Sequence, residues 1–218
     1  MKMDRQIPVI IFLGAPGAGK GTQAEHVAKL KSIPKISTGD MLRAAIQQES
    51  DLGRKVKGIM TEGKLVDDET MLSLVVDRIH QPDCENGFIL DGYPRNLQQA
   101  GQLETVLENY HKMVVVEISV SEEEIVRRIA GRRTCPSCHR IYNVYSRPPK
   151  ENERCDVDGT ALFRRSDDQE DVVRKRIETY KNETLPLIEH YQQKGILHVI
   201  DGSQPEDLVM AGILQVIG

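Results

Sequence analysis

Residues 14–22 read GAPGAGKGT, and this stretch decides the fold of the chain. It follows an apolar run at residues 9–13 and precedes a helix-like stretch at residues 23–30, the order of strand, loop and helix that a phosphate-binding loop requires. The glycines let the backbone wrap an anion closely, and the helix N-terminus adds partial positive charge. Lys20 supplies a mobile cation for the outer phosphates. A glycine-rich turn without a ligand is the plainer alternative, and the presence of strand, lysine and helix together favours the phosphate site.

The loop lacks a hydroxyl at the place where magnesium is usually bound. Gly21 occupies the serine or threonine position, and Thr22 comes one residue later. A second apolar run ends in Asp91, and the C-terminal ends of strands are where open α/β sheets bind ligands. We therefore expect magnesium to be held by water and phosphate oxygens, with Asp91 acting through bound water, unless Asp91 is only a turn residue. Arg95 follows on a turn stiffened by proline and brings a guanidinium to the same edge.

Strands alternate with helices along most of the chain. Apolar runs at residues 113–120 and 196–200 predict further strands, with a helix at 96–110 before the first of them. A long helix is expected from residue 166 to a break near Pro186. Residues 37–66 form a small helical excursion between core elements. The alternation predicts an α/β fold with a doubly wound parallel sheet flanked by helices.

Composition and charge limit the classes of partner. Of 218 residues, 39% are hydrophobic and 28% are charged, so the chain can bury one substantial core with room for an insertion or two. The net charge of −4 provides no overall basic field for nucleic acid. No apolar run approaches the length of a membrane span. We expect a cytoplasmic protein with no nucleic-acid or membrane partner, in which local arginines hold any phosphate ligand.

Three cysteines lie in a segment that has no helical periodicity, between residues 131 and 166. Cys135 and Cys138 form one knuckle, and Cys155 begins a second knuckle in which Asp158 stands where a fourth thiolate is usual. This spacing is typical of a four-ligand zinc ribbon. Because protein groups fill all four positions, the ion would be structural, and it would supply much of the stability of a short segment.

Other interpretations of the cysteines stay open. His139 and Asp156 are rival fourth ligands, although neither repeats the knuckle spacing. Free thiols on a mobile hairpin are a further alternative, which we favour less than zinc. Cys84 is remote in sequence and has no paired ligand nearby, so we expect it to be an ordinary thiol.

The motifs together resemble the adenylate kinase family. The segments that carry the resemblance run from end to end in the family's order: GAPGAGKGT at 14–22, STGDMLR at 37–43, GFILDGYPR at 87–95, the arginine-rich stretch 128–133 and RRSDDQEDVVRKR at 164–176. The cysteine-bearing segment resembles the zinc-containing lid of bacterial members. The chain departs from the family pattern at Tyr93, where phenylalanine is usual, at Asp158, and at Arg127, which duplicates Arg128.

The resemblance implies a P-loop NTPase-type fold and a reversible, magnesium-dependent phosphoryl transfer in which ATP and AMP give two ADP. Its partners would be ATP, AMP and ADP, and the enzyme would be a monomer. The resemblance also implies a core of residues 1–36, 67–130 and 169–218, a monophosphate-binding insertion at 37–66, and a lid with structural zinc at 131–168.

The same resemblance implies roles for individual residues, by motif match. Arg128 would stack on the ATP adenine, Asp91 and Asp168 would orient magnesium through water, and Asp167 would couple the lid to the site. ATP contacts would come from Gly17, Ala18, Gly19, Lys20, Gly21, Thr22, Arg128, Arg132, Ile141, Tyr142 and Gln204. AMP contacts would come from Thr38, Gly39, Arg43, Lys64, Leu65, Val66, Gly92, Tyr93, Arg95, Gln99, Arg165 and Arg176. Groups around the transferred phosphoryl would be Lys20, Asp91, Arg95, Arg132, Arg165, Asp167, Asp168 and Arg176.

Two other functions stay open from sequence. One is a kinase for another monophosphate, such as UMP or GMP, because base choice depends on contacts near Thr38, Val66 and Gln99 that sequence leaves undecided. The other is a zinc-ribbon module that binds nucleic acid or protein and uses nucleotide as a switch. The acidic balance and the lack of a basic aromatic surface weigh against this second function.

Overall fold

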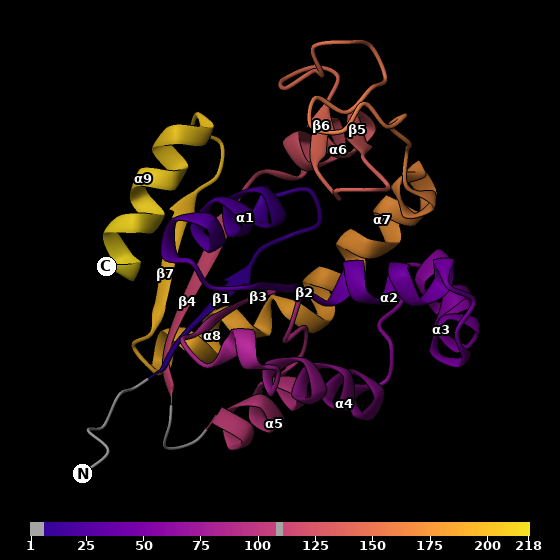
Figure 1. Ribbon diagram of the computed structural model, residues 1–218. Helices are drawn as coiled ribbons and strands as arrows, with labels where there is room; N and C mark the ends of the chain where they lie inside the picture. The colour runs from indigo at the N-terminus through magenta and orange to yellow at the C-terminus, as the bar shows by residue number, and fades with distance from the viewer. Residues whose placement is uncertain (1–6, 108–110) are drawn as a thin grey trace.

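A central parallel sheet organises the chain, as the computed structural model in Figure 1 shows. The structure describes residues 7–107 and 111–218; residues 1–6 of the expected core and 108–110 of the expected helix 96–110 lie outside the described residues. The sheet has five strands in the order β2-β3-β1-β4-β7, and all neighbours are parallel. The predicted doubly wound α/β fold is confirmed. The strands are β1 (Ile7–Leu13), β2 (Lys35–Ser37), β3 (Phe88–Asp91), β4 (His111–Ser119) and β7 (Leu197–Asp201).

Strand β1 is buried on both faces of the sheet. Val9, Ile10, Ile11 and Phe12 are each at most 4% exposed, and successive side chains of a strand point to opposite faces. Val9 and Ile11 pack with residues of α4, α5 and α8, whereas Ile10 and Phe12 pack with α1 and α9. A continuous apolar run is what a strand covered on both sides requires. These helices are α1 (Lys20–Lys31), α4 (Asp68–Ile79), α5 (Leu97–Leu107), α8 (Pro186–Gln193) and α9 (Glu206–Ile217).

A third apolar cluster supports the loop that follows β1. Ala15 packs there with residues of α6 (Glu122–Ala130) and α7 (Glu170–Thr179). Since α7 also carries Arg176 of the expected site, this packing ties the position of Arg176 to that of the loop. Within the described part of the chain, none of the helices is long and apolar enough to cross a membrane.

Two segments lie outside the layers of the sheet (Figure 1). One contains α2 (Thr38–Gln47) and α3 (Asp51–Thr61). Ser50 caps α3, because its Oγ accepts from the backbone N–H of Gly53 at 3.1 Å. The other contains β5 (Arg132–Thr134) and β6 (Ile141–Asn143), which pair antiparallel.

The structure refines two expectations from sequence. Strand β2 has only three residues, too few to show periodicity, and no strand was predicted there from the sequence; pairing with β3 makes it a strand. The long helix expected from residue 166 begins only at Glu170, after a 3₁₀ turn at Ser166–Asp168. The expected break near Pro186 is a π-helical turn at Tyr180–Thr184, and Pro186, which has no N–H to donate, is the first residue of α8.

Candidate active site

The glycine-rich loop joins the end of β1 to the start of α1. Gly14, Gly17 and Gly19 have φ angles of 137°, 81° and 105°, which residues with side chains rarely adopt. A Cβ on Gly14 would lie 2.5 Å from the carbonyl oxygen of Ile118, so close packing also requires glycine there. Lys20 Nζ donates to the carbonyl oxygen of Gly14 at 2.8 Å, which holds the ammonium against the loop. The strand, glycine loop and helix predicted from sequence are therefore present in this order, with Lys20 held against the loop.

The ammonium of Lys20 lies in a strongly perturbed environment. Burial lowers its pKa from the usual 10.5 to about 8, and the positive charges of Arg95 and Arg176 act in the same direction. Only the carboxylate of Asp91 opposes the shift. A phosphate bound at this point would supply the missing negative charge, so the perturbed pKa marks a functional position.

A cleft of about 590 Å³ opens beside the loop, a volume suited to a small-molecule ligand. Arg128 is fixed at its wall, because Nη1 donates to the carbonyl oxygen of Ala18 at 3.2 Å and Nη2 to that of Gly202 at 2.8 Å. The residues predicted to contact ATP all line this cleft: Gly17, Ala18, Gly19, Lys20, Gly21, Thr22, Arg128, Arg132, Ile141, Tyr142 and Gln204.

A second, smaller hollow lies beside α2 and the end of β3. Most residues predicted to contact AMP line it: Thr38, Gly39, Arg43, Lys64, Leu65, Val66, Gly92, Arg95, Gln99 and Arg176. Arg165 lines the large cleft instead. The side chain of Tyr93 lines neither space; it is 0% exposed, packs in the core, and its hydroxyl has no hydrogen-bond partner among the described residues. The structure therefore gives this side chain a packing position.

Aspartates hold the arginines between the two spaces. Arg132 Nε donates to Asp168 Oδ2 at 2.8 Å, and its Nη2 binds the other oxygen of the same carboxylate. Arg176 Nη1 donates to Asp167 Oδ2 at 2.7 Å. Such pairs restrict the guanidinium planes before any ligand arrives.

Asp40 is a site residue that the sequence reasoning missed. It binds Arg43 and lies 3.8 Å from Arg165 Nη2. The only local signal was its place in the motif at residues 37–43. The two arginines hold the pKa of Asp40 at about 2, although burial acts in the opposite direction, so the carboxylate stays ionised.

The cations of the site outnumber its carboxylates. Burial, with Arg43 and Arg132 close by, lowers the pKa of Arg165 to about 10. Burial likewise lowers the pKa of Arg176 to about 10 although Asp167 opposes the change. Guanidiniums crowded in this way bind a polyanion favourably, since its charge relieves their mutual repulsion.

The two aspartates predicted to orient magnesium differ in access. Asp91 lines the large cleft. A Cβ on Gly21 would lie 3.2 Å from Asp91 Oδ2, so the missing side chain leaves room in front of this carboxylate. Asp168 has a side chain that is 0% exposed and is paired with Arg132. Asp91 thus has the open position that a water-mediated magnesium site needs, whereas the carboxylate of Asp168 is paired with Arg132; the magnesium role of both stays a prediction.

The predicted zinc ligands come together in the segment that contains β5 and β6. One ligand atom from each of Cys135, Cys138, Cys155 and Asp158 lies within 4.8 Å of the others. The sulfur atoms of Cys138 and Cys155 are 3.5 Å apart, and Cys135 Sγ is 3.4 Å from Asp158 Oδ2. Three thiolates and a carboxylate at these separations fit a tetrahedral zinc ion.

The rival ligands do not join this cluster. His139 and Asp156 are not part of it, and Asp156 Oδ1 accepts from the backbone N–H of Lys150 at 2.8 Å. Cys84 is buried beside Arg78 and takes no part in the cluster. Of the ligand sets considered from sequence, the structure favours the one with Asp158.

None of the following side-chain contacts between separate segments of the chain was predicted from the sequence. Arg147 Nη1 lies 3.1 Å from Glu206 Oε1, and Asn143 Nδ2 donates to the carbonyl oxygen of Arg128 at 2.8 Å. Thr184 Oγ1 donates to a backbone oxygen in the turn after β3. No local pattern reports such pairs, because the partners are far apart along the chain.

Comparisons with known proteins agree with this geometry. A model of the adenylate kinase family matches residues 12–196. A protein named adenylate kinase from Archaeoglobus fulgidus is 50% identical over 197 residues, which is 89% of this chain and 91% of the relative. Adenylate kinases from Thermosipho africanus and Exiguobacterium sibiricum are 45% and 44% identical over 95% and 96% of this chain, and 98% of each relative is covered. The chain therefore belongs to the adenylate kinase family.

Proposed function

We propose that this enzyme catalyses the reversible, magnesium-dependent transfer of a phosphoryl group from ATP to AMP, giving two ADP. One observation supports the proposal above the others: the large cleft and the smaller hollow share the wall residues Gly39, Arg43, Gly92, Arg95 and Arg176. Nucleotides bound in the two spaces would meet tail to tail among guanidinium groups.

ATP is assigned to the large cleft. The backbone N–H groups of residues 17–22 and the ammonium of Lys20 would bind its phosphates. Arg128 would carry the adenine on a guanidinium already held by the carbonyl oxygens of Ala18 and Gly202. Ile141, Tyr142 and Gln204 would complete the base and ribose contacts.

AMP is assigned to the smaller hollow. Arg95 and Arg43 would bind its phosphate, and the backbone of Lys64, Leu65 and Val66 would face the nucleoside. Gln99 Nε2 donates to Asp68 Oδ1 at 2.8 Å, which leaves the second N–H of this amide for the base.

The transfer step would depend on alignment and positive charge. Arg132, Arg165 and Arg176 would surround the equatorial oxygens of the phosphoryl group, where charge spreads in the transition state. Asp168 and Asp167 hold two of these arginines in place, so little reorganisation is needed. The acceptor is an ionised phosphate, so the reaction needs no general base.

We propose that two insertions close over a core of residues 1–36, 67–130 and 169–218. Residues 37–66 would close over the monophosphate and residues 131–168 over ATP. Water competes with the acceptor phosphate, so a kinase must exclude solvent before it reacts. Adenylate kinase lids are themselves a standard example of such closure.

Magnesium bound with ATP would neutralise phosphate charge, and Asp91 would hold its water ligands. The set Cys135, Cys138, Cys155 and Asp158 would hold zinc as a structural ion in the lid. We propose that the enzyme acts as a monomer, as the family resemblance implies. We propose that the enzyme acts in the cytoplasm, where cysteines stay reduced and can bind a metal ion.

A coupled assay of ADP formation tests the proposal, with AMP, CMP, UMP and GMP as acceptors. AMP should be the best acceptor, and equal or better use of another base would support a different monophosphate kinase. Lys20→Ala and Arg95→Ala should lower kcat/KM about a hundredfold or more while circular dichroism stays unchanged. Arg174→Ala is the control, because Arg174 pairs with Glu170 on the surface. Tight binding of DNA or RNA at moderate salt would favour the switch module instead.

A further inference from the structure

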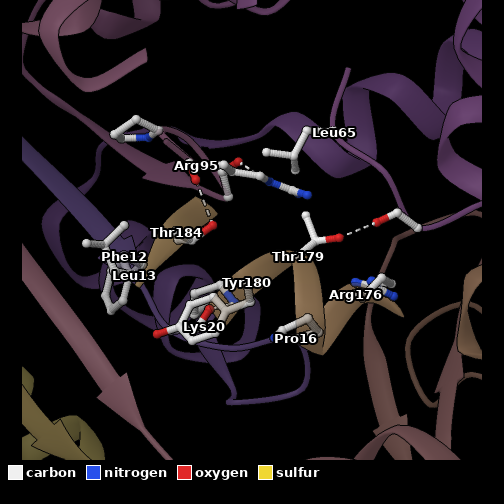
Figure 2. Close-up of a pocket in the computed structure, with 14 residues that line it drawn as sticks. Phe12, Leu13, Pro16, Lys20, Leu65, Arg95, Arg176, Thr179, Tyr180 and Thr184 are labelled. Atoms are coloured by element: carbon white, nitrogen blue, oxygen red, sulfur yellow. Dashed lines mark hydrogen bonds between the residues drawn. The ribbon is translucent and has the colours of Figure 1, made fainter. Parts of the chain in front are cut away.

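The π-helical turn Tyr180–Thr184 lies between α7 and α8, and Tyr180 and Thr184 line the pocket drawn in Figure 2. The backbone N–H of Leu185 donates to the carbonyl oxygen of Tyr180 at 2.8 Å, which widens the helix by one residue at this point. Such turns occur mostly as isolated features inside helices and are frequent at functional sites. The widened turn places the side chains of this segment differently from a regular helix.

The side chain of Thr184 leaves the helix and binds another segment. Thr184 Oγ1 donates to the carbonyl oxygen of Arg95 at 2.7 Å, a contact drawn in Figure 2. A threonine within a helix usually returns its hydroxyl to a carbonyl four residues earlier, as Thr105 does with Gly101 at 3.0 Å. Thr184 is only 7% exposed, so water does not compete freely for its hydroxyl.

The backbone of Arg95 depends on side chains for its position. Arg95 lies between β3 and α5, where no strand or helix ladder holds it. Its N–H donates to Gln99 Oε1 at 2.8 Å, and its carbonyl oxygen accepts from Thr184. The two side chains thus hold the peptide groups on either side of this Cα.

A pocket of the site borders this turn on one side. A cavity of about 70 Å³ lies against it, lined among others by Pro94, Arg95, Tyr180 and Thr184. Figure 2 shows Arg95 and Thr184 on the wall of this cavity.

We propose that Thr184 is a positioning residue for Arg95, and through it for the phosphate of the monophosphate substrate. This inference rests on the proposed function, because it requires that Arg95 binds that phosphate. The guanidinium also donates from Nε to the carbonyl oxygen of Gly92 at 2.8 Å, so a shift of the turn moves the whole phosphate-binding group. Displacements of about 1 Å in a positioning element can cost about a hundredfold in rate. Arg95 also lines the large cleft, but Arg128 there is held by the carbonyl oxygens of Ala18 and Gly202, so we expect the larger effect on AMP.

The test uses Thr184→Val, which keeps the shape and removes the donor, and Thr184→Ser, which keeps the donor. Thr105→Val is the matched control, because it removes a threonine hydroxyl bonded only within α5. Steady-state kinetics with AMP and with ATP varied, together with calorimetric binding of AMP and ATP, are measured well below each variant's unfolding midpoint.

We expect Thr184→Val to lower kcat/KM for AMP about tenfold, as the carbonyl loses its buried partner, while KM for ATP stays within about twofold. Thr184→Ser should recover most of the loss, and Thr105→Val should match the wild type. Unchanged AMP parameters in Thr184→Val, equal losses for both nucleotides, or no recovery with serine would overturn the inference while the proposed function stands. A wild-type enzyme that neither binds nor phosphorylates AMP would overturn both.

Discussion

The contact between Arg147 and Glu206 should bias the closure of residues 131–168. Arg147 belongs to that segment, and Glu206 opens α9 on the core side; both line the large cleft. Arg147 Nη1 lies 3.1 Å and 3.3 Å from the two oxygens of Glu206, and His26 Nδ1 lies 3.5 Å from one of them. Glu206→Gln removes the charge and keeps the size of the side chain.

The expected magnitude follows from the exposure of the pair. The side chains of Arg147 and Glu206 are 33% and 42% exposed, so water and salt screen their attraction. Pairs of this kind contribute about 0.5–1 kcal/mol, or about a two- to fivefold change in an equilibrium. In Glu206→Gln the equilibrium between the closed and the open state should shift toward the open state by that factor. KM for ATP should rise about two- to fivefold, and kcat should rise with it if opening limits turnover.

The assay compares KM for ATP at low and high ionic strength in the coupled reaction. The difference between wild type and variant should shrink at about 0.5 M salt, where charges are screened within a few ångström. Asp207→Asn is the control, because it removes a charge from the same first turn of α9 without an ion pair to Arg147. In an Arg147→Gln background, Glu206→Gln should have no further effect.

Two results would refute this reasoning. An equal rise of KM in Asp207→Asn would assign the effect to the helix dipole. An unchanged KM in Glu206→Gln at low salt would mean that the contact does not bias closure at all.

Three further predictions concern charge and metal. Because burial lowers the pKa of Lys20 to about 8, kcat/KM for ATP should fall as pH rises through about 8, and Lys20→Arg should abolish that fall. The effect of pH on stability should have the opposite sign. The unfolded chain holds this proton up to about pH 10.5, whereas the folded chain loses it above about pH 8. Raising the pH from 8 to 10.5 should therefore increase the free energy of unfolding of the wild type relative to that of Lys20→Met. Asp168→Asn should cost about 3 kcal/mol in urea denaturation by breaking the buried pair with Arg132, and a loss below about 1 kcal/mol would contradict this pairing. Cys135→Ser should lower the zinc content and the Tm, while turnover at moderate temperature should fall less. If the wild-type protein, purified without chelator, holds no zinc, the metal assignment is contradicted.

Local sequence patterns were sufficient to predict the sites that are formed by residues close together in the sequence. The order of strand, glycine loop and Lys20 predicted the phosphate site, because its geometry needs only adjacent backbone groups. The run ending in Asp91 predicted a carboxylate at the ligand edge of the sheet. The knuckle at Cys135 and Cys138 predicted the metal cluster, since spacing fixes how near two thiolates can lie.

Tertiary structure decided what depends on partners far apart along the chain. Strand β2 has three residues, too few for a periodic signal, and only its pairing with β3 makes it a strand. Motif matching could place Tyr93 near a nucleotide, whereas the packing around it buries the side chain in the core. Sequence alone predicted which groups carry the chemistry; the folded chain decided which aspartate holds which arginine and that Thr184 reaches Arg95. Periodicity and spacing act over a few residues, whereas these contacts arise only when the sheet and its helices bring remote segments together.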